Sequence, residues 1–307
     1  MMKIRKTISP YSYIKDKNGW IHVVRWYLDD QHIITKPYYS PQKKKQKKSL
    51  DEPSLPCGSK LDFISRYDYL IKNEHIDEII NPQIIRQDIH FPSDINDIIN
   101  YYDNITADVF LFGSRLLKIN KKTSDWDLII DINDNPKDIT DSLLKKNKEL
   151  RHLNKYEIEK RVEHYSMQYP ISNFCFLRSL FSKSCLYLKS PTINEIGLFF
   201  LNSDYQYDYM TNDIYKIFDK DTRITKISGT IKKGIGESFS FPRIFCITNS
   251  AGVNLNVISL SWEIGGIEEL IGIKISINKT IKIGNNLYFM LDIKNNIAVM
   301  EDQIDFF

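Results

Sequence analysis

The sequence has few cysteines, and none of them is spaced as in a metal site. The four cysteines lie far apart in 307 residues, without the paired spacing of a zinc site or the density of a disulfide-stabilised domain. The six histidines also lack metal-ligand spacing. These residues are Cys57, Cys175, Cys185 and Cys246, and His22, His32, His75, His90, His152 and His164. We therefore expect a reducing compartment, no thiol nucleophile, and a structural or exposed place for each histidine.

The chain also lacks a net charge large enough to hold a polyanion. Its 42 basic and 39 acidic residues give a formal net charge of +3, so a nucleic-acid site would need a local basic patch. No run approaches the roughly 18 apolar residues of a membrane span, and Met1 to Lys6 do not lead into a long apolar segment. These absences predict a cytoplasmic protein with no membrane partner, and they leave the oligomeric state open.

The N-terminal part has the pattern of a β-rich segment. Tyr11 to Ile14 and Trp20 to Leu28 predict two strands around Asn18-Gly19, because this dipeptide readily adopts the positive φ angles of a tight hairpin. A further strand is expected at His32 to Tyr39.

A lysine-rich run follows this segment and has almost nothing to bury. It contains Lys43, Lys44, Lys45, Lys47 and Lys48. Such a run can attract the phosphates of RNA, and nearby tyrosines can stack on bases. The alternative interpretation is a solvated linker, which a lysine-rich composition also produces.

Helical and extended patterns alternate in the central part. Apolar residues between Leu61 and Ile71 recur at helical spacing, and Ser93 is placed to cap a second helix. Apolar runs at 107–112 and 126–132 predict neighbouring strands, and helices are expected near 139–144 and 156–165. From position 93 the expected order is helix, strand, helix, strand, helix.

Short β-branched runs dominate the sequence from Ile224 onward. They predict strands near 227–231, 243–247, 255–261, 271–277, 287–293 and 297–300, with a short helix or bend at 265–272. Strands at this spacing are typical of a small barrel or sandwich, which we interpret as an accessory domain.

Two short motifs at the central strands carry the chemistry. Gly113-Ser114 ends the first strand at the start of a helix, where backbone N–H groups and a hydroxyl can approach phosphate oxygens. Asp125 and Asp127 lie two residues apart, so their carboxylates project from one face of an extended chain. Two such carboxylates can hold Mg²⁺ shared with a substrate phosphate.

The two motifs together predict a site for a nucleoside triphosphate. Arg115 and Lys118 follow the Gly-Ser turn and are candidates for neutralising triphosphate charge, although each is equally explained as surface charge. The alternative is that Gly-Ser is an ordinary turn and Asp-Trp-Asp only begins a strand. The combination, with apolar strands on both sides, favours the functional interpretation.

At these residues the chain resembles the DNA-polymerase-β-type nucleotidyltransferase superfamily, whose members share a Gly-Ser cradle and an Asp-x-Asp strand. It is most similar to a mainly archaeal branch of predicted nucleotidyltransferases with a β-rich start and a small C-terminal β domain. The segments 19–41, 86–103, 227–231, 239–242 and 257–259 carry this wider resemblance. It implies transfer of a nucleoside monophosphate from an NTP, with Mg²⁺ or Mn²⁺ at Asp125 and Asp127.

The resemblance also implies a third metal-binding carboxylate on a later strand. The run 194–200 is the best strand candidate, with Glu195 its only acid and Gly197 where an acid could have stood. Glu195 is thus a candidate catalytic residue, and the alternative is an exposed acid at the end of a strand.

We therefore expect an α+β protein with a central mixed sheet and helices. The composition, 42% hydrophobic and 26% charged, is typical of globular proteins, and the length favours several domains. The expected parts are a β-rich segment at 1–58, a nucleotidyltransferase domain at 59–222 and a C-terminal β domain at 223–307. The predicted function is metal-dependent transfer of a nucleotide to an acceptor hydroxyl, for which RNA is a candidate. The alternative is a catalytically weak nucleotide- or RNA-binding regulatory protein.

Overall fold

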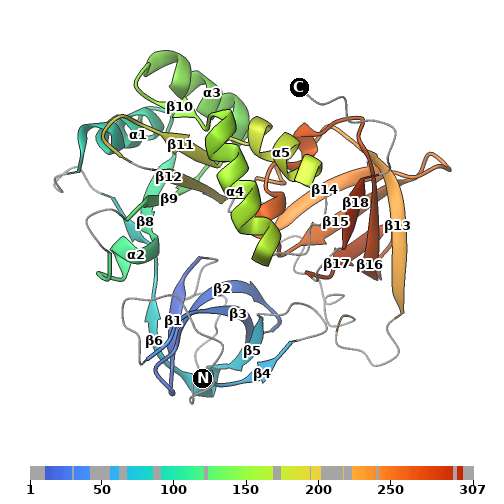
Figure 1. Ribbon diagram of the computed structural model, residues 1–307. Helices are drawn as coiled ribbons and strands as arrows, with labels where there is room; N and C mark the ends of the chain where they lie inside the picture. Colours follow the sequence, from blue (N-terminus) through green and yellow to red (C-terminus); the bar gives the residue numbers. More distant parts are fainter. Residues whose placement is uncertain are drawn as a thin grey trace. The chain divides into compact units, whose positions relative to one another are not determined.

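The computed structural model divides into two compact units (Figure 1). Unit 1 comprises Met1–Ile84 and Phe110–Ser124, and unit 2 comprises Ile85–Val109 and Asp125–Phe307. The structure describes residues 11–29, 31–41, 56–61, 68–85, 91–120, 124–168, 174–193, 195–201, 217, 223–239, 242–292 and 296–299. No helix in these ranges is both long and apolar enough to cross a membrane.

Unit 1 contains a six-stranded antiparallel sheet in the order β4-β5-β3-β2-β1-β6. Its elements are β1 Tyr13–Asp16, β2 Ile21–Tyr27, β3 His32–Tyr39, β4 Ser59–Lys60, β5 Tyr69–Lys72, η2 Asn73–His75 and β6 Ile76–Ile80. The predicted strands of the β-rich segment are confirmed, and Gly19 has the expected positive φ in the turn between β1 and β2. The lysine-rich run from Lys43 to Lys48 lies outside the described residues.

A buried polar network joins the strands of unit 1. The Asp16 carboxylate accepts hydrogen bonds from the backbone N–H groups of Trp20 and Cys57 and contacts Nε2 of His22 at 3.1 Å. Nδ1 of His22 lies 3.0 Å from the Thr35 hydroxyl. All three side chains are fully buried, so their mutual hydrogen bonds replace those lost to water. His22 is therefore structural.

The helix predicted between Leu61 and Ile71 is wrong at its C-terminal end. Tyr69–Lys72 forms β5, and Leu70 and Ile71 pair with Ile34 and Ile33 of β3. The apolar spacing is compatible with a helix, but the chain there completes backbone hydrogen bonds with a distant strand. Residues 62–67 lie outside the described part.

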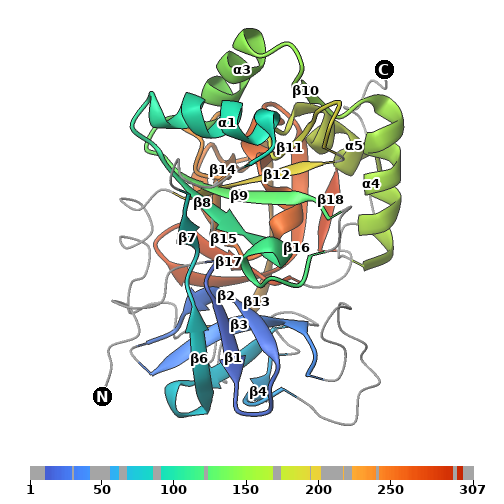
Figure 2. The same cartoon turned by 90° about the vertical axis from the view of Figure 1, so that its left-hand side faces the viewer.

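Unit 2 begins with a mixed sheet in the order β10-β11-β12-β9-β8, to which β8 contributes Asp108 and Val109 (Figure 2). In unit 1 the rest of β8 pairs with β7. The elements of this region are β7 Gln83–Ile84, α1 Ser93–Asp103, β8 Asp108–Phe112, α2 Gly113–Leu116, β9 Trp126–Asp131, α3 Pro136–Lys146, β10 Arg151–His152, α4 Lys155–Gln168, α5 Phe174–Lys183, β11 Tyr187–Lys189 and β12 Ile196–Leu201. β9 and β12 are parallel, and the predicted order from α1 to α3 is confirmed.

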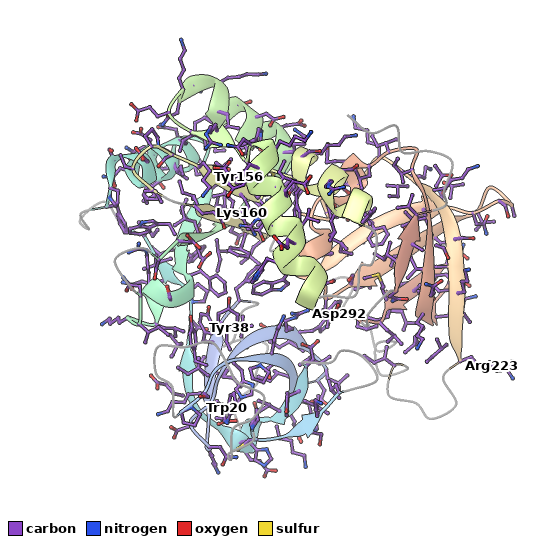
Figure 3. All side chains as sticks on the ribbon, viewed as in Figure 1. Trp20, Tyr38, Tyr156, Lys160, Arg223 and Asp292 are labelled. Carbon is purple, nitrogen blue, oxygen red and sulfur yellow. The ribbon has the colours of Figure 1, made fainter. Side chains whose placement is uncertain are left out.

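Local signals define the ends of the helices. Asn135 caps α3 through its side chain, and Asn154 and Glu157 form a reciprocal capping box at the start of α4. The predicted Ser93 cap is wrong, because Pro92 occupies the N-cap position and Ser93 is already the first helical residue. Lys160 and Tyr156 lie on the exposed side of α4, with Nζ of Lys160 4.4 Å from the ring centroid of Tyr156 (Figure 3).

A closed five-stranded barrel forms the rest of unit 2. Its ring order is β13-β14-β15-β17-β16, closed by the β13–β16 pairing, and β18 adds to β16. The elements are β13 Ile224–Ile231, β14 Arg243–Thr248, β15 Asn254–Ser259, η4 Trp262–Ile264, η5 Ile267–Glu269, β16 Lys274–Gly284, β17 Leu287–Met290 and β18 Ile297–Val299. The short helical turn η5 falls within 265–272, where a helix or bend was expected, and η4 lies just before that segment.

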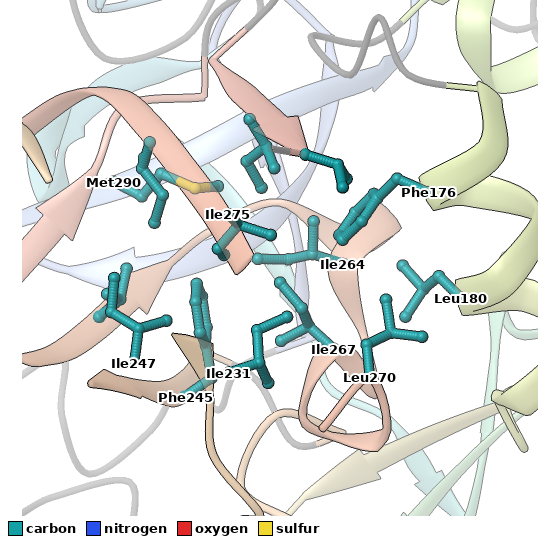
Figure 4. Packing of buried hydrophobic residues seen from close by; sticks show 14 of the residues in the cluster. Phe176, Leu180, Ile231, Phe245, Ile247, Ile264, Ile267, Leu270, Ile275 and Met290 are labelled. Carbon is teal, nitrogen blue, oxygen red and sulfur yellow. The ribbon is translucent and has the colours of Figure 1, made fainter. Parts of the chain in front are cut away.

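The barrel and helices α4 and α5 share one apolar core (Figure 4). Phe176 and Leu180 of α5 belong to the same buried cluster as Phe245 and Ile275 of the barrel. Burial of this much apolar surface joins α5 and the barrel. The α+β class, with a β-rich start, a central mixed sheet and a C-terminal barrel, is therefore confirmed.

Candidate active site

The Gly-Ser turn lies in unit 1, directly after β8. The ring of Phe112, the last residue of β8, lies 5.5 Å from Tyr11 and 5.1 Å from Tyr13, measured between centroids, which anchors the end of the strand. Gly113 has a φ of 70°, a conformation that glycine adopts without steric strain. Ser114 is half-buried in α2. The predicted strand, glycine turn and helix are present, with a helix of only four residues.

Arg115 and Lys118 occupy different local environments. Nη2 of Arg115 donates a hydrogen bond of 2.7 Å to the carbonyl oxygen of Ser124. This bond connects α2 to Ser124, the residue that directly precedes Asp125. Lys118 is exposed and has a positive φ of 56°. A role for either side chain with a triphosphate stays a prediction.

The two aspartates lie at the start of β9 in unit 2. Asp125 is exposed immediately before the strand, and Asp127 is half-buried within it. The N–H of Trp126 donates to the Glu195 carbonyl at 3.0 Å, and its ring contacts Phe91. The chain is thus extended here, and alternation places the two aspartates on the side opposite Trp126.

Gly197 leaves space for the Asp127 carboxylate. The two residues are direct partners in the parallel pair of β9 and β12. A Cβ atom at position 197 would come within 2.9 Å of Oδ1 of Asp127 and 3.1 Å of the Phe199 ring. Oδ1 of Asp127 therefore leans over the glycine, and any side chain at 197 would displace it.

Glu195 is engaged by an arginine. Its carboxylate forms an ion pair with Nη2 of Arg161, a residue of α4. The Arg161 guanidinium carbon lies 3.4 Å from the ring centroid of Tyr187, so the cation is held by both a charge and a ring face. Sequence reasoning missed Arg161 and Tyr187, because nothing in their spacing links them to Glu195.

The donor set fits a divalent ion that is shared with substrate. Within the described part of the chain, no three His, Cys, Asp or Glu side chains gather as a metal cluster. Mg²⁺ commonly takes only one or two carboxylates from the protein and completes its shell with water and substrate phosphate. Asp125 and Asp127, at the exposed start of β9, supply oxygens of this kind.

Comparison with known proteins identifies the domain that carries these residues. Residues 93–180, from α1 into α5, match the family model of the nucleotidyltransferase domain. The match includes Gly113, Ser114, Asp125 and Asp127 and ends before Glu195. Neither curated proteins nor solved structures give a match to this chain. The resemblance inferred from the two motifs is therefore confirmed for residues 93–180, whose match to the nucleotidyltransferase domain is consistent with the polymerase-β-like superfamily.

Proposed function

We propose that this protein transfers a nucleoside monophosphate from an NTP to an acceptor hydroxyl and that Asp125 and Asp127 hold the Mg²⁺ or Mn²⁺ required. The observation that carries the proposal is the pair of aspartates at the open end of β9, inside the matched nucleotidyltransferase domain. When bound, such an ion stabilises negative charge on the entering and leaving oxygens.

In the same proposal, the residues of the Gly-Ser turn in unit 1 bind the triphosphate. Gly113 lets the backbone turn tightly after β8, and the Ser114 hydroxyl donates to a phosphate oxygen. Arg115 and Lys118 offset the remaining negative charge. The acceptor oxygen bonds to the α-phosphorus, and the proton of the acceptor hydroxyl goes to solvent. The bond between the α-phosphorus and the oxygen that bridges to the β-phosphate breaks, and pyrophosphate leaves.

The acceptor in this proposal is an RNA hydroxyl. The lysines at 43, 44, 45, 47 and 48 are suited to the RNA backbone, because each lysine–phosphate contact releases a counterion. Replacing all five with glutamine is expected to weaken RNA binding and its dependence on salt. Salt-dependent binding that survives this change would remove these lysines from the proposal.

The enzyme is tested with labelled NTPs. The wild-type chain is incubated with each NTP, with Mg²⁺ or Mn²⁺, and with RNA, protein or small-molecule acceptors. Asp127→Asn keeps the shape of the side chain but removes its charge, and is expected to lower product formation at least about 100-fold. Asp134→Asn is the control for loss of one carboxylate charge, since Asp134 is an exposed acid of unit 2 outside the proposed site. Product that forms equally well without the Asp127 charge would overturn the proposal.

A second candidate function is a catalytically weak nucleotide- or RNA-binding regulatory protein. It is favoured by the environment of the third acid: Glu195 is paired with Arg161, and Gly197 brings no carboxylate to β12. Calorimetry with each NTP, followed by a pyrophosphate assay, separates the two candidates. NTP binding without pyrophosphate release favours regulation, whereas turnover excludes it.

A further inference from the structure

The barrel of unit 2 carries an exposed charge of one sign. Seven cations are exposed on it: Arg223, Lys226, Lys232, Lys233, Lys274, Lys279 and Lys282. No acid whose side chain is described in this region is exposed, since Glu237 and Glu269 are half-buried and Glu268 and Asp292 are buried. The chain as a whole is nearly balanced, with 42 basic and 39 acidic residues. A lysine-rich composition therefore does not explain this local excess.

Several cations elsewhere in the described chain pair with carboxylates, whereas others, such as Lys145, Lys148 and Lys155, do not. Lys15 pairs with Asp77, Lys137 with Asp141, Arg151 with Glu157 and Arg178 with Glu159, at 3.3, 2.6, 2.7 and 2.6 Å. None of the seven barrel cations forms such a pair with a described carboxylate. Their charge remains available to a partner.

Five of these cations follow the β13–β16 pair along its length. Lys274 is opposite Thr230 at one end of the β13–β16 pair. At the other end, Arg223 immediately precedes β13 (Figure 3) and Lys282 follows the Ile224–Ile281 pair. The eight residues of β13 span about 25 Å at the usual rise of a strand. We call this surface, formed by Arg223, Lys226, Lys274, Lys279 and Lys282, the barrel strip.

The middle of the barrel strip brings like charges together. The register shifts between Thr225 and Ile227, so Lys226 faces the bulge that contains Lys279. Like charges that face one another across strands destabilise a sheet unless a counter-charge lies between them. A bound polyanion would supply that counter-charge along the whole strip.

The barrel strip also offers surfaces for stacking. Tyr288 of β17 is the direct partner of Lys282, so both side chains lie on the same face of the sheet. Tyr288 is half-buried, and Ile224 at the start of β13 is 56% exposed. The Tyr288 ring also packs in part against the core of unit 2, so only its remaining surface can meet a base. Positive charge beside a partly exposed ring and an exposed aliphatic side chain suits unpaired bases on a phosphate backbone better than a closed duplex.

We propose that the barrel strip binds single-stranded nucleic acid, with the lysines on the phosphates and Tyr288 against a base. This binding goes beyond nucleotidyl transfer and does not depend on it. Its test is an equilibrium measurement without NTP, so failure of the strip and failure of the enzyme proposal are distinguishable.

The test measures fluorescence anisotropy of labelled oligouridine against the full chain at several salt concentrations. One variant changes Lys226, Lys274, Lys279 and Lys282 to glutamine. The matched control changes Lys145, Lys148, Lys155 and Lys183 to glutamine, which removes the same charge from exposed positions on other elements. Circular dichroism and thermal unfolding establish that both variants remain folded.

The strip variant is expected to bind at least about 10-fold more weakly, and the slope of log K against log salt should fall by about 3 if all four lysines contact phosphates. The control variant should bind as the wild type does. Equal affinity in the strip and control variants would overturn the proposal. The proposal would also be overturned if the wild type bound anionic phosphatidylserine vesicles but not the oligonucleotide, and if only the strip variant lost this vesicle binding. A folded Tyr288→Ala variant that binds no less tightly would remove the stacking contact.

Discussion

The Glu195 carboxylate pairs with the Arg161 guanidinium, whose central carbon lies 3.4 Å from the ring centroid of Tyr187. The exposed side-chain fractions are 12% for Arg161 and 21% for Glu195, so water screens this pair only in part. The geometry gives Glu195 a partner of opposite charge, and Asp125 and Asp127 lie at the start of β9. A role for Glu195 as a third metal ligand stays a prediction.

The first prediction concerns this ion pair. Arg161→Gln and Glu195→Gln should each lower the free energy of unfolding, because each leaves a partly buried charge without its partner. The double variant should lose less free energy of unfolding than the two single variants lose together. The difference, measured by urea unfolding, should be at least about 0.5 kcal/mol. The exposed Arg178–Glu159 pair, which also involves α4, is the control and should contribute about 1 kcal/mol or less.

Activity measurements on the same variants test the role of Glu195. We expect Glu195→Gln to retain much more nucleotidyl transfer than Asp127→Asn. If Glu195→Gln left stability unchanged but removed as much activity as Asp127→Asn, Glu195 would instead act as the third metal ligand.

The second prediction concerns Gly197. Gly197→Ala places a methyl group 2.9 Å from Oδ1 of Asp127, so the carboxylate has to move. The Mg²⁺ concentration for half-maximal activity should rise by about 10-fold, as for other changes that reorient a metal ligand. Gly252→Ala is the control: this glycine has open space around it and a φ of 77°, so the change should alter stability alone. An unchanged Mg²⁺ dependence in Gly197→Ala would contradict a metal-binding role for Asp127.

The third prediction concerns a buried acid in the barrel. Glu268 is 2% exposed, and neither of its carboxylate oxygens has a well-formed hydrogen bond within the described residues. Burial raises the pKa of Glu268 to about 7, and the charge of Glu269 adds to this rise, while nearby backbone N–H groups of Gly236 and Ser238 oppose it. The folded state therefore favours the protonated acid.

Because folding raises the pKa of Glu268, the stability associated with the protonated acid is fully present below its unfolded pKa near 4.5. This stability is lost as the pH rises through the folded pKa of about 7. The difference between the folded and unfolded pKa values corresponds to a loss of about 3 kcal/mol in the free energy of unfolding above pH 8. Urea unfolding at pH 5.5 and 8.5 should show a loss in the wild type that is absent from Glu268→Gln. Equal losses in both proteins would show that Glu268 is not the titrating group.

Much of the fold was predictable wherever local signals agreed with the tertiary contacts. The hairpin around Gly19, the order from α1 to α3, and the C-terminal strands follow from turn residues and side-chain periodicity. The helix predicted up to Ile71 is wrong because β5 pairs with β3, more than thirty positions away along the chain. Periodicity does not record which distant strand supplies the hydrogen bonds.

The candidate site was only partly predictable. Gly113, Ser114, Asp125 and Asp127 were identified because phosphate binding and metal binding need small groups of residue types that are close in sequence. Arg161 was missed because it is thirty-four positions from its partner Glu195, and no local pattern connects them. The place of Gly197 beside Asp127 likewise depends on the register of β12 with β9.

The local chemistry of this protein is set by residues that are close in the sequence: a glycine able to adopt a positive φ before Ser114, and two carboxylates on alternate positions of an extended chain. The residues that surround this chemistry depend instead on the fold. It paired Glu195 with Arg161, set Gly197 beneath the Asp127 carboxylate, and closed the barrel through β13 and β16 so that lysines far apart in sequence share one surface. The physical reason is that backbone geometry and alternation are properties of neighbouring residues, whereas strand register and ion pairing depend on contacts that form only when the chain folds.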